Sequence, residues 1–317
     1  MTKTTQLGVV MDPIASIQPA KDSSLALLLQ AQVAGWQLYC LEIQDLWLRD
    51  GDAFGRATPI CVADDPDHWF QRGDPVIMPL HELDVVLMRK DPPFNMEYIF
   101  ATYILERAEL RGSLVVNRPQ ALRDANEKMV VSWFPDCVPP WLVSSSLVEL
   151  RAFVAEQQRV VVKPLDRMGG RSIFVTHAGD PNRNVILETL TNNGSQFVMV
   201  QKYIAEAPQG DKRIILIDGD PVPFGLLRIP PPDDFRGNLC TGATPQAVPL
   251  TERDRWICDQ LAPLLRSQGL LFVGIDVIGD YLTEVNVTSP TGIRELDRFC
   301  GLNIGRDIIA AIAKKLG

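Results

Sequence analysis

The sequence predicts an α/β protein, with a parallel sheet near its start and an antiparallel hairpin near its end. Gln6–Met11 and Gln37–Ile43 are short apolar runs on either side of a helical stretch, Leu25–Ala34. This β-α-β order is typical of a parallel sheet with a crossover helix. Residues 271–295 contain an apolar run, a Gly-Asp connection and then alternating apolar and polar residues. Two such runs around a short turn predict a hairpin.

The elements between these two landmarks follow from periodicity and from capping residues. Residues 22–24 supply N-cap candidates for the first helix, and Gly35 ends it. Residues 49–80 contain Gly, Pro and Asp throughout, so we expect mostly loop with one short strand. Further strands and helices are predicted, in chain order, at Leu83–Met88, Asn95–Arg111, Leu114–Asn117, Arg118–Lys128, Ser146–Gln157, Val160–Lys163, Ser172–Thr176, 182–192, Phe197–Gln201, Lys212–Asp218, Pro221–Ile229, Thr251–Ser267 and Arg306–Lys315.

One long stretch, 230–249, shows little periodicity and is rich first in proline and then in glycine and threonine. A structureless loop of that length is uncommon inside a compact domain and usually serves as a lid or a binding loop. We therefore expect residues 230–249 to form a lid that is mobile without substrates.

Composition excludes several classes of function. Lys+Arg total 31 against 39 Asp+Glu, and a net charge of −8 offers no electrostatic basis for binding nucleic acid or an anionic membrane. The six cysteines and three histidines are scattered without metal-ligand spacing, which argues against a zinc site. No run approaches 18 apolar residues, and the start of the chain lacks the pattern of a signal peptide. We expect a cytoplasmic protein.

The hairpin near the end of the chain carries acidic residues in a suggestive register. If its connection is Gly279–Tyr281, then Asp276 lies directly opposite Glu284. Asn286 is two residues beyond Glu284 and so shares its face. Two carboxylates at cross-strand distance repel each other, and a hard divalent cation such as Mg²⁺, which prefers oxygen ligands, removes that repulsion. The alternative is an amphipathic hairpin whose acids face water.

A second candidate site begins at Lys163, which ends a predicted strand. The loop 166–171 follows it and contains Gly169 and Gly170, whose backbone amides can approach an anion closely. This is neither a Walker A loop nor a Rossmann fingerprint, because the spacing and the following strand do not fit. A phosphate-binding loop and a plain hairpin turn both remain possible from these residues alone.

The chain also resembles the bacterial glutathione synthetase family of the ATP-grasp superfamily, over essentially its whole length. The segments that carry the resemblance are VVMDPI at 9–14, KDSS at 21–24, LMRKDPPF at 87–94, ATYILERAE at 101–109, NRPQALRDANEK at 117–128, KPLDRMGGRSIF at 163–174, DKRIILIDGDPVP at 211–223, RGNL at 236–239 and VGIDVIGDYLTEVNVTSPT at 273–291.

The resemblance implies an ATP-grasp fold with three parts. Residues 1–122 would form an N-terminal parallel-sheet (pre-ATP-grasp) domain, residues 123–202 a small lid subdomain, and residues 203–317 a C-terminal α+β subdomain with the metal site. It also implies ATP as co-substrate and Mg²⁺ or Mn²⁺ as the metal, small peptide and amino-acid substrates, and a homo-oligomer.

The resemblance further implies a role for particular residues. The nucleotide would contact Lys128, Lys163, Gly169, Gly170, Gln201, Lys202, Tyr203, Ile204 and Lys212. The metal ligands would be Asp276, Glu284 and Asn286. Arginines at the acyl-transfer centre and on the long lid would be Arg213, Arg228 and Arg236. The peptide substrate would meet Arg89 and Asp91, and the small amine would meet Ser289, Pro290 and Thr291.

The implied reaction is the ATP-dependent joining of a carboxylate to an amine. In the family's reaction γ-glutamylcysteine and glycine form glutathione through an acylphosphate, with release of ADP and phosphate. Two alternatives are a paralogous ligase that uses another γ-glutamyl peptide or amine, and an inactive nucleotide-binding regulator. The presence of the full lysine and metal-ligand sets argues against the regulator.

Some positions depart from the family pattern, and they lie on loops. Arg167 and Arg171 stand where the family has glycine or a small residue, Asn95 replaces an aspartate, and 241–246 lacks the usual lid arginine. These departures are either drift in a true synthetase or the mark of a changed substrate. The two arginines either point into solvent or supply the missing positive charge to the phosphates.

Overall fold

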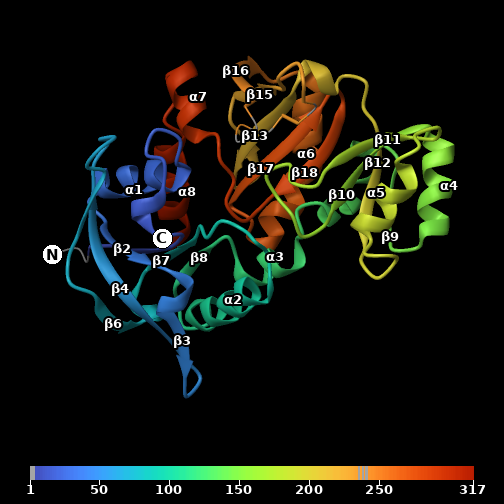
Figure 1. Cartoon of the computed structure of the whole chain (residues 1–317). Coiled ribbons are helices and arrows are strands. Elements are labelled where there is room, and N and C mark those ends of the chain that lie inside the picture. Colours follow the sequence, from blue (N-terminus) through green and yellow to red (C-terminus); the bar gives the residue numbers. More distant parts are fainter. Residues whose placement is uncertain (1–3, 235, 238, 240–241) are drawn as a thin grey trace.

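The computed structural model describes residues 4–234, 236–237, 239 and 242–317, and it divides the chain among three sheets (Figure 1). An N-terminal sheet, a four-stranded sheet and a C-terminal sheet follow one another along the chain. Among the described residues, no helix combines the length and apolar content that a membrane crossing requires. The mixed α/β architecture predicted from the sequence is confirmed.

The N-terminal sheet has the strand order β3-β4-β2-β1-β7-β8, with β5 and β6 paired to β4. Its central strands β2, β1, β7 and β8 run parallel, as the β-α-β pattern predicted. The strands are β1 (Gln6–Val10), β2 (Gln37–Leu41), β3 (Leu46–Arg49), β4 (Asp52–Val62), β5 (Phe70–Arg72), β6 (Val76–Pro79), β7 (Val85–Met88) and β8 (Leu114–Val116).

The prediction of mostly loop for residues 49–80 was wrong, because β4 is one of the longest strands of the protein. Gly55 and Pro59 hid the strand, since both residues are usually strand breakers. A Cβ atom at position 55 would lie within 2.7 Å of side-chain carbons of Leu41 and Leu80, so any larger residue would force those side chains to move. Pairing of β4 with four other strands outweighs its weak local preference.

Helices from both ends of the chain cover the N-terminal sheet. Helix α1 (Ser23–Val33) begins at Asp22, whose carboxylate accepts a hydrogen bond from the Leu25 amide. The C-terminal helix α8 (Ile304–Leu316) packs against α1, so the blue and red ends of the ribbon lie side by side in Figure 1. The other helices of this part are α2 (Met96–Glu109) and α3 (Pro119–Asp124).

The four-stranded sheet is antiparallel, in the order β11-β10-β12-β9, and α4 and α5 cover it. Most of its buried residues form an apolar cluster of their own between residues 142 and 200, whereas Met199 belongs to one of the two clusters that mix residues of the N-terminal and C-terminal sheets. The elements are β9 (Trp141–Ser144), α4 (Leu147–Gln157), β10 (Arg159–Pro164), β11 (Phe174–His177), α5 (Arg183–Leu190) and β12 (Val198–Lys202).

The C-terminal sheet has the order β16-β15-β13-β17-β18, with β14 paired to β13. Two of its elements were not predicted. Strand β16 lies within the stretch expected to be a structureless lid, and helix α7 follows Gly292. Residues 235, 238 and 240–241 of that stretch lie outside the described residues. The elements are β13 (Asp211–Ile217), β14 (Asp220–Pro221), β15 (Phe224–Ile229), β16 (Thr244–Pro249), α6 (Glu252–Gln268), β17 (Phe272–Ile278), β18 (Tyr281–Asn286) and α7 (Ile293–Cys300).

The close approach of α8 to α1 gives a first testable prediction. A Cβ atom at Gly305 would lie 2.8 Å from the backbone oxygen of Ala26. Gly305→Ala should therefore lower the free energy of unfolding by about 1–3 kcal/mol, the usual cost of overpacking, although alanine favours helices by about 1 kcal/mol. The control is Ala310→Gly on the exposed face of the same helix, where alanine should be the better residue. Urea unfolding measures both, and a stabilised Gly305→Ala variant would contradict the packing.

Candidate active site

The hairpin β17–β18 places Asp276 directly opposite Glu284, as predicted. The predicted route to that register was wrong, however. The connection is the two residues Gly279 and Asp280, and a bulge after Asp276 shifts the register by one residue. A bulge inserts one extra residue into one strand, so a shorter turn still gives the same pairing. Asn286 lies on the same face and donates from Nδ2 to Asp276 Oδ2 at 3.3 Å.

Asp276 belongs to a buried chain of alternating charges on β13, β15 and β17. Arg213 donates from Nε and Nη2 to its two carboxylate oxygens, at 2.5 and 2.9 Å. Arg228 Nη2 lies 3.0 Å from Asp276 Oδ1 and 2.7 Å from Asp211 Oδ2. Arg213, Arg228 and Asp276 are each at most 6% exposed. The two arginines thus bind two acids whose side chains are largely buried.

Burial and pairing act on the two acids in opposite directions. Burial alone would raise the pKa of Asp276, but Arg213 and Arg228 outweigh it and hold that pKa well below the usual range. Burial raises the pKa of Asp211 to about 6, although Arg228 partly offsets the effect. Asp276 therefore keeps its charge to a lower pH than Asp211 does.

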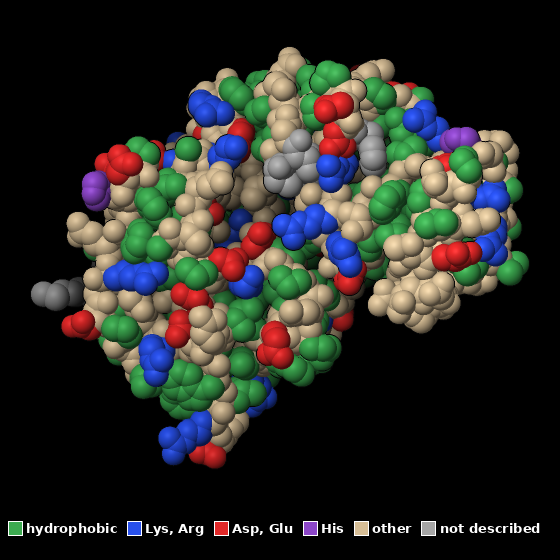
Figure 2. Space-filling model, in the orientation of Figure 1, with side chains coloured by type: hydrophobic (Ala, Val, Ile, Leu, Met, Phe, Trp, Pro, Cys, Tyr) green, Lys and Arg blue, Asp and Glu red, His purple; other side chains and the backbone are tan. Residues whose placement is uncertain are grey.

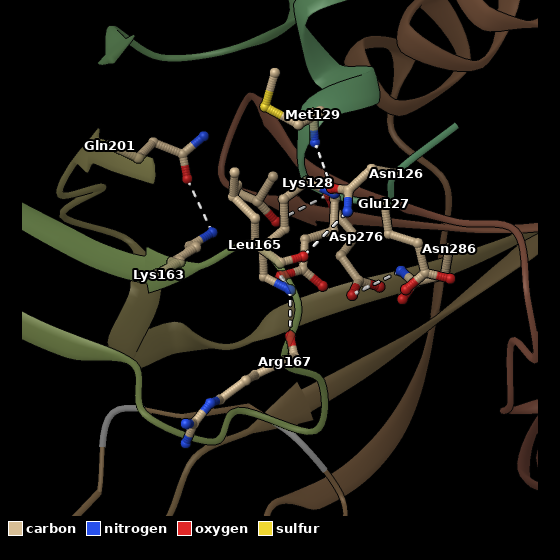
Figure 3. Close-up of polar contacts among 12 residues, drawn as sticks. Asn126, Glu127, Lys128, Met129, Lys163, Leu165, Arg167, Gln201, Asp276 and Asn286 are labelled. Carbon is tan, nitrogen blue, oxygen red and sulfur yellow. Dashed lines mark hydrogen bonds and ion pairs between the residues drawn. The ribbon is translucent and has the colours of Figure 1, made fainter. Parts of the chain in front are cut away.

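The two lysines predicted to reach phosphate lie near this row of buried charges (Figure 3). Lys128 Nζ donates to the backbone oxygen of Arg167 at 2.6 Å and lies 3.7 Å from Glu284 Oε1. Lys163 Nζ donates to Gln201 Oε1 at 3.0 Å, and burial lowers its pKa. Each ammonium group is thus held by oxygen atoms that an anionic ligand could replace.

The lysines line a first cavity of about 90 Å³, termed the lysine cavity. It lies between the four-stranded and C-terminal sheets, and Asp276 and Glu284 form part of its wall. Val161, Ile173 and Ile278 give it an apolar side. The predicted nucleotide-binding residues that it brings together are Lys128, Lys163, Gly169, Gly170, Gln201, Lys202, Tyr203 and Ile204.

A larger cavity of about 650 Å³, termed the arginine cavity, adjoins the first. Arg213 and Arg228 line it together with Asn286, and Glu284 and residues 167–169 line both cavities. The substrate residues predicted from the resemblance that it contains are Asp91, Ser289, Pro290 and Thr291. Figure 2 shows a hollow in the middle of the molecule with basic and acidic side chains around its rim.

Arg89 lies behind this cavity rather than in its wall. It lines a neighbouring cavity of about 290 Å³ that shares Asp91, Ser289 and Thr291 with the arginine cavity. Its Nε donates to Ser24 Oγ and its Nη2 to the backbone oxygen of Pro290. Burial lowers the pKa of Arg89 to about 10, and its Nη1 has no hydrogen-bond partner among the described residues.

Two other basic residues predicted for the site, Arg236 and Lys212, have different surroundings. Arg236 lines the lysine cavity, and its Nη1 donates to the backbone oxygen of Gly170 at 3.4 Å. Lys212 lines neither cavity, and its assignment to the nucleotide stays a prediction. Side chains alternate along β13, so Lys212 faces away from Arg213 and donates to the buried Asp254 of α6.

Sequence reasoning missed two acidic residues of the site. Asp211 lies two positions before Arg213 on the same strand, so strand alternation could have placed it there. Glu127 lines the arginine cavity and is held by the backbone that follows β18. No local pattern marked Glu127, because its partners lie about 160 residues away in the chain.

The oxygen atoms around Glu284 fit a small divalent cation. Within the described ranges, no group of three or more His, Cys, Asp or Glu side chains lies together as a metal site. Mg²⁺ typically uses only one or two carboxylates, with water and substrate phosphates completing its shell. Asp276, Glu284 and Asn286 could supply two carboxylates and an amide oxygen, and the lowered pKa of Asp276 would keep this candidate ligand ionised.

Several solved structures have a fold similar to that of this protein. D-cycloserine synthetase DcsG aligns over 98% of this chain and all of its own, with a TM-score of 0.71 and 16% identity. D-alanyl-alanine synthetase A from Vibrio cholerae O1 biovar eltor aligns over 100% and 99%, with a TM-score of 0.61 and 14% identity. The ATP-grasp ligase PsnB aligns over 99% of each chain, with a TM-score of 0.63.

These matches show the fold alone, and together with the family models that match the chain they define an ATP-grasp ligase. Two family models match, "Prokaryotic glutathione synthetase, N-terminal domain" over residues 5–123 and "Prokaryotic glutathione synthetase, ATP-grasp domain" over residues 127–301. The chain belongs to the prokaryotic glutathione synthetase family. A glutathione synthetase from Pseudomonas aeruginosa is 55% identical over 313 residues, which is 99% of each chain. One from Coxiella burnetii is 53% identical over 310 residues, covering 98% and 97%.

The buried charge chain generates a prediction about pH. Arg228→Met should lower the free energy of unfolding near pH 8 by about 3–5 kcal/mol, because two buried carboxylates then share one arginine. Without Arg228 the pKa values of Asp211 and Asp276 rise. A carboxyl group whose folded-state pKa exceeds its unfolded value stabilises the fold at low pH, and that contribution is lost as the pH rises. The difference in free energy of unfolding between wild type and Arg228→Met should thus become smaller as the pH falls from about 8 through 6, near the pKa of Asp211.

Urea unfolding at several pH values measures this gap. The control is Arg266→Met, which removes an exposed pair with Asp220 and should cost less than about 1 kcal/mol at every pH. A gap for Arg228→Met that does not change with pH would contradict the assigned role of the two acids.

Proposed function

We propose that this protein joins γ-glutamylcysteine to glycine with ATP, through an acylphosphate, and releases ADP and phosphate. The observation that supports it most is the junction at Glu284, where a lysine-lined and an arginine-lined cavity meet. One cavity suits a triphosphate and the other suits a carboxylate substrate, so the reacting groups would meet at Glu284 and residues 167–169. Membership of the glutathione synthetase family supports the choice of substrates.

The nucleotide would enter the lysine cavity by displacing the loop 166–171. At about 90 Å³ this cavity is smaller than the roughly 300–1,000 Å³ of most ligand sites. Lys128 holds the loop by its bond to the backbone oxygen of Arg167. Exchange of that oxygen for a phosphate oxygen would free the loop and let Lys128 and Lys163 neutralise the triphosphate. The adenine would lie near residues 201–204 and the apolar Ile278.

We assign Asp276, Glu284 and Asn286 to a divalent cation. When bound, Mg²⁺ or Mn²⁺ would neutralise phosphate charge and polarise the phosphate that is transferred. The protein itself would keep Asp276 ionised through Arg213 and Arg228 and would hold Asn286 against it.

The arginine cavity would hold the acyl group and the attacking amine. Arg228 lines it, and its buried Nε has no hydrogen-bond partner among the described residues, so this N–H is a candidate donor to the oxyanion that forms on attack. Residues 289–291 would receive the amine, and Arg89 with Asp91 the rest of the peptide. Loop closure would exclude water, because an exposed acylphosphate hydrolyses.

Ranges 1–122, 123–202 and 203–317 are our proposed domains, and the separate apolar cluster within 142–200 supports an independently moving lid.

A paralogue with another acyl peptide or amine is the second candidate, favoured by Arg167 and Arg171 in the wall of the arginine cavity. Phosphate release with a panel of dipeptides and amines tests both. Glycine-dependent release with γ-glutamylcysteine as the best substrate supports the first proposal. A clear preference for another pair supports the paralogue, and no amine-dependent release with any pair would overturn both.

The metal assignment predicts the effect of a single change in the hairpin. Glu284→Ala should lower turnover about 100-fold or more, the usual loss when a charge-stabilising group is removed from a reacting centre. Phosphate release at saturating Mg²⁺ measures it. Asp280→Ala at the exposed hairpin turn is the matched control and should retain wild-type turnover. Near-normal activity of Glu284→Ala would sink the assignment.

Arg167 and Arg171 have different surroundings, so we expect their replacement to change the kinetics to different extents. Arg171 lines the arginine cavity, and its guanidinium makes no ion pair or hydrogen bond to the described residues, whereas Arg167 donates to Ser172. Arg171→Gly should raise a Michaelis constant, for ATP or for the peptide, by about 5–10-fold, as expected when one charged hydrogen bond is lost. Arg167→Gly should change it less. Unchanged kinetics in both variants would make these arginines surface drift.

A further inference from the structure

Glu127 makes more contacts with the backbone after β18 than any role assigned above requires. Its Oε1 accepts hydrogen bonds from the amides of Val287 and Thr288, at 3.0 and 3.2 Å, and from the Thr288 hydroxyl at 2.8 Å. Its own backbone oxygen accepts from the Val285 amide at 3.0 Å. One buried residue therefore holds the chain from 285 to 288.

These amides need an acceptor that the sheet does not give them. Strand β18 ends at Asn286, so the amides of Val287 and Thr288 lie beyond the ladder, in a buried segment. A buried N–H without an acceptor costs about 1–3 kcal/mol. On the other side of the segment, Asn117 Nδ2 donates to the Val287 backbone oxygen at 2.7 Å. The segment is fixed from both sides.

The residues that follow this segment are 289–291, which line the arginine cavity together with Glu127 and Thr288. The bonds to Glu127 fix the backbone from which 289–291 continue, while Arg89 and Arg213 donate to the backbone oxygens of Pro290 and Thr291. The nucleotide side of Glu127 is held differently. Asn126 Oδ1 accepts from the amides of Lys128 and Met129, and Asn126 Nδ2 donates to the Leu165 backbone oxygen (Figure 3).

We propose that Glu127 is a positioning residue for the amine, which fixes residues 287–291 as the wall against which the amine docks. The inference rests on the proposed function and deepens it. Asn126 does the corresponding task for Lys128 and hence for the nucleotide. Two adjacent side chains thus divide the work, one toward each cavity.

The carboxylate is the suitable group for this position. A single oxygen receives three donors, and hydrogen bonds to an ionised acceptor are about twice as strong as neutral ones. A glutamine keeps the shape and one acceptor oxygen but loses the charge, so it should loosen the segment without emptying the space. The loosened wall should weaken binding of the amine and leave the triphosphate contacts intact.

The test compares Michaelis constants in a crossed design. Glu127→Gln should raise the Michaelis constant for glycine about tenfold, the effect of weakening charged hydrogen bonds, and leave that for ATP within about twofold. Asn126→Ala should instead raise the Michaelis constant for ATP and leave that for glycine within about twofold. Turnover of Glu127→Gln should approach the wild-type value at saturating glycine, which a partly unfolded variant would not show.

Further variants keep the test decisive. Thr288→Val removes only one of the bonds to Glu127 and should raise the Michaelis constant for glycine about threefold, even if Glu127→Gln fails to fold. Ser113→Ala removes a buried hydroxyl that donates to the backbone oxygens of Leu80 and Leu83 and lines neither cavity, so it should lower stability with unchanged kinetics.

The proposal is overturned if Glu127→Gln and Thr288→Val leave the glycine constant unchanged, or if the constants for glycine and ATP rise by the same factor. Failure of the proposed function is a separate result. It would appear as wild-type protein without glycine-dependent phosphate release, before any variant is compared.

Discussion

The buried chain of Asp211, Arg228, Asp276 and Arg213 is the constraint on which the C-terminal sheet depends. Asp211 is paired across the sheet with Arg228, and Arg213 with Asp276, so the same residues set the register of β13 against β15 and β17. A slip by one residue would turn these charges to the other face and leave them without partners in the core, at a cost of several kcal/mol. Register and site chemistry are therefore determined by one set of interactions.

The rest of the site is assembled around that sheet from distant parts of the chain. Lys128 precedes the four-stranded sheet, Lys163 lies on it, and Glu284 stands opposite Asp276 on the hairpin. The backbone oxygen of Arg167 joins the loop to Lys128. The four-stranded sheet has an apolar cluster of its own, and Met199 of β12 joins it to the core of the other two sheets.

Patterns with short range were predictable from the sequence. The pairing of Asp276 with Glu284 followed from strand alternation, although a bulge rather than a longer turn produces it. Features set by distant pairing were not predictable. Strand β4 contains a glycine and a proline and forms because four other strands pair with it, and Glu127 finds its partners about 160 residues away. The assignment of Lys212 to the nucleotide stays a prediction, although alternation along β13 puts it on the face opposite Arg213.

The packing of α8 on α1 has a consequence for synthesis of the protein on the ribosome. Leu25 and Leu28 of α1 are fully buried in a cluster that includes Ile308 and Ile312 of α8. The N-terminal sheet is translated first, yet part of its apolar cover arrives only with α8. Nascent chains therefore expose that face of α1 until α8 has been translated, which makes it a natural binding surface for chaperones that recognise apolar segments.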